Sequence, residues 1–494
     1  MNFQKGFFSN FFKGLAGQTM IYGLGTIVPR LLNYLLLTPF FTRVFNTEAY
    51  GTFSVFYAFS SFSLVLLLHG METTYFRFSV NNDEQKTYNH ALFSTSIFAT
   101  SFLLFLIFFR NQVAGWIGYP SNVNFIVCFA FIIFFDVITA IPFARLRNQN
   151  KALKFSIIKL INVSINILLN IFFYVICRNS DNSFLASLYD PKVNVGYAFF
   201  SNLVASVVSF LLLIPEFKTF RPEISFDFYK TMLKYTWPFI LIGASGMINE
   251  VFDKIFLKFI ECDGMNPLEQ VGIYAANYKI AVLMTIFIQM FNYAAEPFFF
   301  KKSVSTDAKE SYRVVMDYFV IFCLLIFLMV TMYIDIFKYF IGKNFHGGLD
   351  IVTVILLANM FLGIYYNLSV WYKICNKTIC GAVISIIGAV LTLVLNILLI
   401  PHFGYWGCAI ATIACYFVMV VICYFWGHKV YPVNYNVGKI VAYIILALAV
   451  LYTRNLIVLD NTFATLSVST LFMLLYIGIL YYFERKNIKK LLCV

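Results

Sequence analysis

The sequence predicts an all-α polytopic membrane protein, and three observations lead to that class. First, 61% of the 494 residues are hydrophobic and only 12% are charged, which gives a mean hydropathy of +0.80. Second, the apolar residues gather into about 14 stretches of the length that a helix needs to cross a bilayer. Third, the Lys and Arg residues lie mainly between these stretches and are unevenly distributed. A chain of this composition would not stay soluble as a folded monomer.

The predicted transmembrane segments follow one another without room for a soluble domain. They cover residues 17–41, 50–79, 90–109, 123–143, 155–177, 195–215, 232–257, 272–300, 314–337, 349–371, 378–400, 405–426, 437–452 and 463–483. Ahead of them, residues 1–16 place Phe side chains around Lys5 and Lys13, which predicts an amphipathic helix at the membrane interface. This stretch has no small-residue cleavage site, so we expect the first span to be retained.

The basic residues set the predicted orientation. Of the 36 Lys and Arg residues, 24 lie in one alternating set of loops and ends, 8 lie in the opposite set, and 4 lie within the apolar segments. Loops rich in Lys and Arg resist translocation, so the richer side, which includes both termini, is predicted to be cytoplasmic. The net charge of +13 follows from these loops, where anionic lipid headgroups rather than nucleic acid are the expected partner.

A weak internal repeat predicts two lobes. Glu48 and Gly51 open the second span as Glu269 and Gly272 open the eighth. Because six spans per unit preserve orientation, the repeat predicts two parallel six-helix lobes related by an axis along the membrane normal, an arrangement that suits alternating access. The predicted parts are an N-terminal lobe, a C-terminal lobe, and two additional helices with a cytoplasmic tail: residues 1–220, 221–430 and 431–494.

Arg30 is the strongest candidate for a functional charge. It lies near the middle of the first span, where a charged side chain costs roughly 2.5–3.5 kcal/mol on insertion scales. Asn33 follows one turn later on the same face. One interpretation is an anion-binding guanidinium that faces a watery cavity, since Arg suits bidentate phosphate contact. The other is an Arg that pairs for packing with a carboxylate such as Glu72.

The seventh span carries four polar residues close together, Asn249, Glu250, Asp253 and Lys254. Glu250 and Lys254 are four residues apart and can pair along the helix. Asp253 and Lys254 lie near its outer end, so the sequence leaves two interpretations open. Either they face the cavity, or Lys254 snorkels to the membrane interface.

The eighth span supplies another cation and a polar stripe. Lys279 lies about two turns into the helix, beside Asn277, and Gln289, Asn292 and Glu296 recur at helical spacing further on. The predicted substrate contacts are therefore Arg30, Asn33, Lys254, Lys279, Asn277, Gln289 and Asn292.

Buried carboxylates are the candidates for ion coupling or ion pairing: Glu72, Asp136, Glu250, Asp253 and Glu296. Any coupling ion is expected to be H⁺ or Na⁺. In the fifth span, Lys159 begins a polar face of Asn residues that suits interhelical hydrogen bonds better than a substrate path. The sequence has no phosphate-binding glycine loop, HExxH motif or clustered Cys and His residues. It therefore predicts no cofactor, no metal site and no catalytic residues.

Several short motifs near the N-terminus resemble those of the polysaccharide-transport flippases. The matching stretches are residues 14–19, 22–26, 30–34, 48–51, 70–73 and 77–78. These flippases are the Wzx-like members of the multidrug/oligosaccharidyl-lipid/polysaccharide (MOP, MATE-like) exporter superfamily. The specific likeness is confined to these residues, whereas the helix count and the repeat extend it over most of the chain.

The resemblance implies a carrier, not an enzyme, in the bacterial inner membrane. Its implied substrate is an undecaprenyl-diphosphate-linked oligosaccharide, which it turns from the cytoplasmic to the outer leaflet. A polysaccharide polymerase and chain-length machinery are the expected protein partners. Related flippases place cavity cations on the first, seventh and eighth helices, where this chain has Arg30, Lys254 and Lys279. The motifs do not identify the sugar.

Two other functions remain open from the sequence. A cation-coupled multidrug antiporter of the same superfamily would favour buried carboxylates over a central Arg. A membrane polysaccharide polymerase commonly carries a large outer loop with basic residues, whereas the longest predicted outer loop here spans only residues 178–194.

Overall fold

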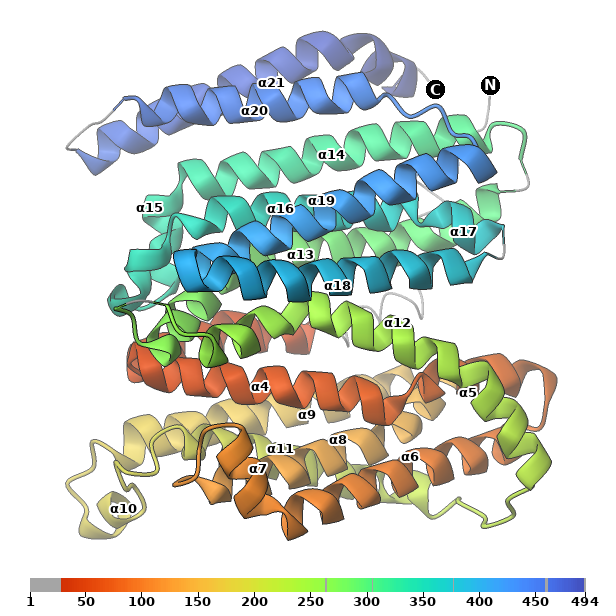
Figure 1. The fold of residues 1–494 in the computed structure, drawn as a ribbon, viewed down its shortest axis with the longest axis vertical. Coiled ribbons are helices and arrows are strands. Elements are labelled where there is room, and N and C mark those ends of the chain that lie inside the picture. The colour runs from red at the N-terminus through yellow and green to blue at the C-terminus, as the bar shows by residue number, and fades with distance from the viewer. Residues whose placement is uncertain (1–27, 263, 304, 376, 458–460, 493–494) are drawn as a thin grey trace. The chain divides into compact units, whose positions relative to one another are not determined.

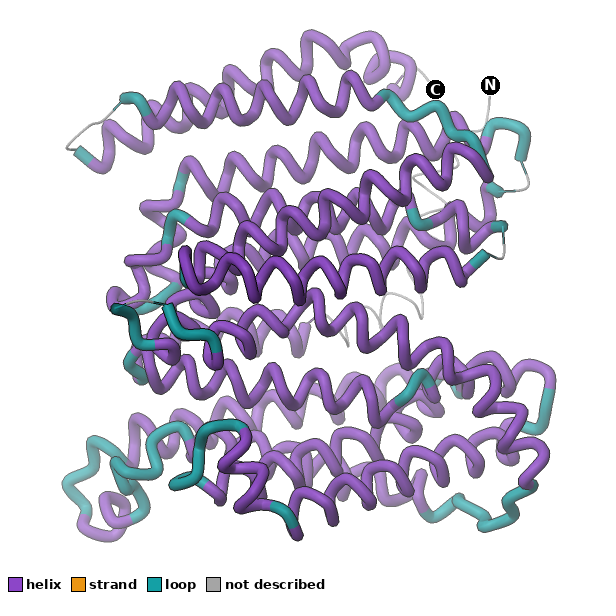
Figure 2. Tube along the Cα trace, in the orientation of Figure 1, coloured by secondary structure: helices purple, strands orange, loops and turns teal. Residues whose placement is uncertain are grey.

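The computed structural model describes residues 28–262, 264–303, 305–375, 377–457 and 461–492, which are almost entirely helical (Figures 1 and 2). These ranges contain no β-strand beyond an isolated bridge between Cys262 and Met265. Twelve helices within them are long and apolar enough to cross a membrane. The predicted fold class, an all-α polytopic membrane protein, is confirmed.

Two predicted spans account for the difference between twelve and fourteen. Much of the first, residues 17–27, lies outside the described residues, as does the predicted interfacial helix at residues 1–16. The seventh forms as the 34-residue helix α12 (Phe226–Phe259). This helix is not among the twelve apolar helices, and it carries four polar residues close together, Asn249, Glu250, Asp253 and Lys254.

Short polar side chains begin several of the helices. Asp83 accepts a hydrogen bond from the backbone N–H of Gln85 at 2.8 Å, and Asn266 accepts one from Leu268 at 3.0 Å. Each cap satisfies an N–H group that the first helical turn leaves without a backbone partner. The caps therefore stabilise helix starts directly after the short loops that connect the spans.

The described residues form two compact units. The N-unit comprises residues 28–45 and 52–247, and the C-unit comprises residues 46–51 and 248–492. Helices α4 and α12 each pass from one unit into the other. The division at residues 220 and 430 stays a prediction, because contact density alone does not identify which parts of a chain move as bodies.

Helix α8 is central to the packing of the N-unit. It packs against α6 and α11, and α11 packs against α9. The elements are η1 (Asn33–Leu37), α3 (Thr38–Val44), α4 (Thr47–Leu68), α5 (Met71–Asn81), α6 (Glu84–Phe108), α7 (Arg110–Trp116), α8 (Val123–Asn148), α9 (Ala152–Ile171), η2 (Phe172–Cys177), α10 (Ser183–Ser187) and α11 (Gly196–Phe217). The first half of α12 completes this unit.

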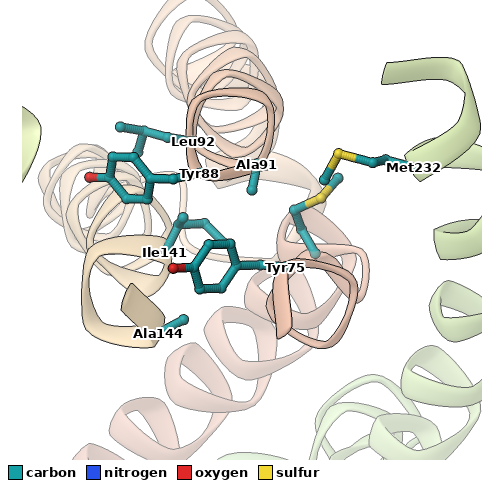
Figure 3. Close-up of a cluster of buried hydrophobic side chains, with 8 residues drawn as sticks. Tyr75, Tyr88, Ala91, Leu92, Ile141, Ala144 and Met232 are labelled. Carbon is teal, nitrogen blue, oxygen red and sulfur yellow. The ribbon is translucent and has the colours of Figure 1, made fainter. Parts of the chain in front are cut away.

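A cluster of buried side chains joins four elements of the N-unit (Figure 3). Tyr75 of α5 and Tyr88 of α6 are fully buried, and Met232 of α12 packs in the same cluster. The two hydroxyl groups point to the same side in Figure 3. Tyr75 donates to Glu84 at 2.8 Å, and Tyr88 donates to the backbone carbonyl of Glu216 at 3.0 Å. The rings thus bury their apolar bodies while both hydroxyl groups keep a partner.

The C-unit is built around α16, which packs against α13 and α19, while α19 packs against α18. The elements are α13 (Pro267–Lys302), α14 (Ala308–Met332), α15 (Ile334–Phe337), η3 (Lys338–Phe340), η4 (Lys343–Gly348), α16 (Ile351–Leu368), α17 (Val370–Ile374), α18 (Thr378–Phe403), α19 (Tyr405–Val430), α20 (Val437–Asn455) and α21 (Thr462–Leu492). The last two helices pair with each other beside α14 (Figure 1). Lys439 of α20 anchors them, since its Nζ lies 3.1 Å from Asp317 of α14 and 2.5 Å from Glu484 of α21.

The two glycines of the internal repeat meet at one helix crossing. A Cβ atom on Gly51 would lie 2.0 Å from the carbonyl oxygen of Leu268, and one on Gly272 would lie 1.9 Å from that of Thr47. The contact is reciprocal, so the first turns of α4 and α13 pack backbone to backbone. The repeated glycine therefore has a steric reason: a residue with a Cβ atom would force the two helices apart.

We expect Gly51→Ala and Gly272→Ala each to destabilise the protein by about 1–3 kcal/mol, the usual range for overpacking. The measurement is thermal unfolding of the purified protein in detergent. Gly478→Ala is the matched control, because nothing lies within 4 Å of a Cβ atom at that position of α21. There the substitution should leave stability unchanged or raise it, since Ala favours helix more than Gly. Equal effects at all three glycines would contradict the crossing.

Candidate functional site

Arg30 and Asn33 are both exposed on the first described helix, where Leu32, Leu35 and Leu36 are exposed as well. Residues 28–32 form an α-helical turn that continues at Asn33 into the π-helical segment η1. The side chains of Arg30 and Asn33 are exposed, whereas Tyr34 and Leu37 are buried. Short π-helical segments often occur at functional sites. The structure therefore keeps these two predicted substrate contacts on one side of the helix.

Lys254 is held by a carboxylate and two aromatic rings of the C-unit. Its Nζ atom lies 3.0 Å from Oδ1 of Asp253 and donates to the backbone carbonyl of Glu250 at 3.3 Å. The same ammonium group lies 4.7 Å from the ring centroid of Tyr278 and 5.5 Å from that of Tyr274, within the range of cation–π attraction.

The lysine therefore pairs with Asp253, and not with Glu250, whose side chain is spaced to pair with it along the helix. The Asp253 side chain is 4% exposed and that of Lys254 is 14% exposed, while Glu250 is exposed. A buried carboxylate needs a nearby counter-charge far more than an exposed one does, because its loss of hydration must be offset. Burial explains why Lys254 pairs with the adjacent residue.

Asn249 joins three helices within the C-unit. Its side-chain carbonyl accepts a hydrogen bond from Thr392 of α18 at 2.9 Å. Its backbone carbonyl accepts one from the hydroxyl group of Tyr416 of α19 at 3.3 Å. Asn249 is buried, so its amide acts as the interhelical connection that polar side chains commonly supply in membrane bundles.

Asn277 connects α13 to the loop that precedes α16. The side chain is fully buried, and Nδ2 donates to the carbonyl of Phe345 in η4 at 2.8 Å. Contact between Asn277 and a substrate, which the sequence predicts, would require the helices around this fully buried side chain to open. Lys279, two residues further along α13, is half-buried.

The polar stripe of α13 contains two kinds of side chain. The Glu296 carboxylate lies 2.7 Å from Nζ of Lys373 in α17, so Glu296 is an ion-pair carboxylate in this structure. Gln289 is exposed and Asn292 is half-buried. The stripe therefore presents two amide groups at or near the surface of α13, and its acidic member faces a basic partner.

A second cluster of charges, only partly buried, lies in the N-unit. Glu72 of α5 lies 3.9 Å from Arg147, and Asp136 of α8 accepts a hydrogen bond from Ser206 at 2.8 Å. The charge of Lys159 on α9 acts on both carboxylates. Glu72, which the sequence offers as a packing partner for Arg30, is thus in contact with Arg147. Lys159, which the sequence assigns to a face of interhelical hydrogen bonds, joins the cluster as its internal cation.

Arg145 is a buried basic residue whose role the sequence does not reveal. Its side chain is 9% exposed, and Nε lies 3.4 Å from Glu84. Nη2 donates to Gln85 at 2.7 Å, and the guanidinium carbon lies 4.2 Å from the ring centroid of Tyr88. Arg145 thus joins the end of α8 to the start of α6. In the sequence it is one of many basic residues that flank a span, and such residues look alike whether they meet lipid headgroups or neighbouring helices.

These arrangements suit ion binding. A guanidinium or ammonium group can hold an anion, and a buried carboxylate can exchange a proton or a small cation. Among the residues that the structure describes, no group of three or more His, Cys, Asp or Glu side chains could hold a metal ion.

The family model for polysaccharide biosynthesis proteins matches residues 15–303, more than half of the sequence. The chain belongs to this family. This match confirms the resemblance to the Wzx-like flippase family that the short N-terminal motifs indicated.

Comparisons with individual proteins agree with the family. Lsg locus putative protein 1 of Haemophilus influenzae is 24% identical over 365 residues, which cover 72% of this chain and 83% of the relative. The lipid II flippase MurJ, in an inward closed conformation, has a TM-score of 0.69 at 16% identity and covers 94% of this chain and 99% of its own. An inward-facing multidrug resistance MATE family transporter of the MOP superfamily has a TM-score of 0.65 at 13% identity, with coverages of 83% and 97%.

At such low identities, the solved structures show the fold alone. This polysaccharide biosynthesis protein has the fold that MurJ and the MATE transporter share, and these two relatives are carriers rather than enzymes. The twelve apolar helices found among the described residues make it a multi-pass membrane protein.

We expect Asp253→Asn and Lys254→Met each to destabilise the protein by about 3–5 kcal/mol, because either change leaves a buried charge without its partner. The double variant should be clearly more stable than either single variant, since it removes both charges together. Thermal unfolding in detergent gives the three values. Asp335→Asn is the control, because its pair with Lys338 is about one-third exposed and such pairs contribute about 0–1 kcal/mol. Effects that simply add in the double variant would rule out the pair.

Proposed function

We propose that this protein is a flippase for undecaprenyl-diphosphate-linked oligosaccharide. The cargo would be an O-antigen, capsule or exopolysaccharide repeat unit, carried across the bacterial inner membrane by alternating access. The observation that supports it best is Arg30, a charged side chain within a predicted span that lies on the exposed face of its helix beside Asn33.

A guanidinium at this depth has few stable surroundings. Facing lipid tails would cost roughly 2.5–3.5 kcal/mol on insertion scales, so we infer that the exposed face of Arg30 lines a water-filled cavity. Arg forms paired hydrogen bonds with phosphate oxygens in a fixed geometry. A diphosphate headgroup supplies such oxygens, while its polyprenyl tail can remain in the bilayer.

The other predicted contacts differ in how readily they reach a ligand. Lys279 is half-buried, and the amides of Gln289 and Asn292 can hydrogen-bond to sugar hydroxyl groups. Lys254 can hold an anion only by exchanging Asp253 for it, because the two groups are in contact at 3.0 Å. We therefore propose Arg30 as the primary contact of the diphosphate and Lys254 as a contact made later in the cycle.

The predicted carboxylates are proposed as the places where H⁺ or Na⁺ is exchanged during transport: Glu72, Asp136, Glu250, Asp253 and Glu296. Asp136 and Asp253 are the strongest of these, since one is hydrogen-bonded to Ser206 inside the N-unit and the other is buried beside Lys254. Both termini are proposed to be cytoplasmic. A polymerase and chain-length machinery would receive the product in the outer leaflet.

A cation-coupled multidrug antiporter is the second candidate. The buried Asp253 favours it, because a buried carboxylate suits a cationic drug as well as a coupling ion. An antiporter has no need of the guanidinium at position 30. Transport that survives the loss of Arg30 but fails with Asp253→Asn would favour this candidate.

The function is tested by the fate of the lipid-linked glycan. A carrier changes no covalent bond, so deletion of the gene should trap complete lipid-linked units on the cytoplasmic leaflet, with no polymer outside. The measurement is the leaflet location and chain length of the accumulated glycan. Single units that reach the outer leaflet but fail to join would identify a polymerase instead.

We expect Arg30→Ala to abolish transport while the protein remains inserted in the membrane. Arg30→Lys should retain part of it, since a charge remains but the planar fork is lost. Surface glycan and the amount of membrane-inserted protein are measured together. Arg43→Ala is the control. That exposed arginine lies in the last turn of α3 and donates to the carbonyl of Pro39 in the same helix. Normal surface glycan with Arg30→Ala would exclude an essential role, and loss of the protein would favour the packing interpretation.

A further inference from the structure

The second predicted span is interrupted near its middle. Helix α4 ends at Leu68 and α5 begins at Met71. Between them His69 has φ of 37° and Gly70 has φ of 74°, so two successive residues adopt the left-handed conformation. For a residue other than Gly this conformation is uncommon and costs roughly 1–2 kcal/mol. Such strain persists only where the surrounding structure enforces it, and it concentrates at functional sites.

The His69 side chain holds this break in place. The imidazole is 3% exposed, and Nδ1 lies 2.6 Å from the carbonyl oxygen of Leu67. A continuous helix would pair that carbonyl with the N–H of residue 71. Because a carbonyl oxygen only accepts, Nδ1 must carry the proton, and Nε2 is then an acceptor in the neutral ring. The break and the tautomer of His69 are thus linked.

A hydrogen-bonded relay connects Nε2 to α12. Nε2 lies 3.0 Å from Oγ of Ser94 on α6, and the same oxygen lies 3.1 Å from the hydroxyl oxygen of Tyr229 on α12. With Nε2 as an acceptor, Ser94 donates to His69 and Tyr229 donates to Ser94. Every polar atom of the relay is satisfied while the imidazole is neutral. A proton on Nε2 would make the ring a donor, so the Ser94 hydroxyl group could no longer donate to it and would have to turn away.

Other contacts hold the first half of α12 against the break. A Cβ atom on Gly70 would lie 2.5 Å from Cβ of Phe239, and the hydroxyl groups of Thr74 and Thr236 are in contact. The second half of α12, from residue 248, belongs to the C-unit. The helix that completes the relay is therefore also a covalent connection between the two units.

Few charges surround the imidazole in this arrangement. On α12 the group that faces it is Tyr229, through Ser94 of α6. On α5, Glu72 follows three residues later in the sequence and contacts Arg147. No ion pair in the described part of the chain includes His69. An imidazolium here would lack a counter-charge, so this conformation favours the neutral ring.

We propose that His69 is a proton-binding site that opens when α12 leaves α4 and α5. Departure of α12 removes Tyr229 from the relay and exposes Nε2 to water, from which it takes a proton. The conformation with α12 displaced thus binds a proton more tightly than the conformation in this structure. By linkage, acid then favours the displaced conformation. This proposal rests on the proposed carrier function, for which it names H⁺ as the coupling ion. The proton binds to the imidazole of His69.

The direct test follows the contact between α5 and α12 in the full-length protein in membranes. Thr74→Cys with Thr236→Cys places two thiols where the threonine hydroxyl groups meet. We expect the disulfide yield, measured by mass spectrometry of the cross-linked peptides, to fall between about pH 8 and pH 5, the range in which His titrates. Adding His69→Asn should leave only the fall that thiol oxidation itself shows, because Asn tolerates the left-handed backbone but does not titrate. At each pH, the disulfide yield of the double-cysteine protein is divided by the yield of the same protein that also carries His69→Asn. This ratio removes the pH dependence of thiol oxidation.

His90→Asn is the matched control. His90 is fully buried in the same unit, and its Nε2 accepts a hydrogen bond from the N–H of Ser225 at 2.9 Å. This change should leave the pH-dependent fall in place. Tyr229→Phe breaks the relay without altering His69 and should move the fall to higher pH. The same pH response with and without His69→Asn would overturn the proposal, as would a response to His90→Asn equal to that of His69→Asn.

The proton site and the flippase function can fail separately. A pH-dependent disulfide together with no trapped lipid-linked glycan in the deletion strain would support the site and refute the flippase. Trapped glycan together with a disulfide yield that does not depend on His69 would support the flippase and refute the proton site. In cells, export of surface glycan should lose its dependence on external pH with His69→Asn.

Discussion

The free-energy cost of an unpaired charge inside a bilayer governs the polar interior of this protein. Asp253 and Lys254 pair within one turn of α12 and are enclosed by aromatic rings. In the N-unit the charge of Lys159 lies within range of the carboxylates of Glu72 and Asp136. Removing one partner of a buried pair such as Asp253–Lys254 costs about 3–5 kcal/mol, whereas an exposed pair contributes about 0–1 kcal/mol. The buried pairs must therefore be kept or exchanged as the protein moves.

This constraint makes anion binding at Lys254 an exchange reaction. A diphosphate that takes the ammonium group leaves the Asp253 carboxylate, only 4% exposed, without its counter-charge. Binding is then favourable only if Asp253 gains a proton or a cation at the same time. Arg30 differs, because its side chain is exposed in this structure. An anion contact at Lys254, if the proposed function holds, is therefore connected to ion uptake at Asp253.

The sequence predicted the features that depend on local pattern and missed those that depend on tertiary partners. Long apolar stretches predict membrane-spanning helices because length and hydropathy are properties of each segment. The repeated Gly51 and Gly272 were also detectable, although their reciprocal contact emerged only from the fold. The break at His69 was missed although Gly70 stands beside it, because two of the residues that hold the imidazole, Ser94 and Tyr229, lie on other helices. Hydropathy cannot show which neighbours a side chain meets.

Helix α12 relates these features to one another. It spans 34 residues without interruption, roughly 50 Å at the rise of an α-helix. Its first half completes the hydrogen-bonded relay to His69, and its second half carries the Asp253–Lys254 pair. Pro238 lies between the two and, lacking an N–H, marks the position where the helix bends most easily. Phe239, the next residue, packs directly on Gly70 at the break in the neighbouring span. The two helices thus have their weakest points side by side, so motion at one must be accommodated at the other.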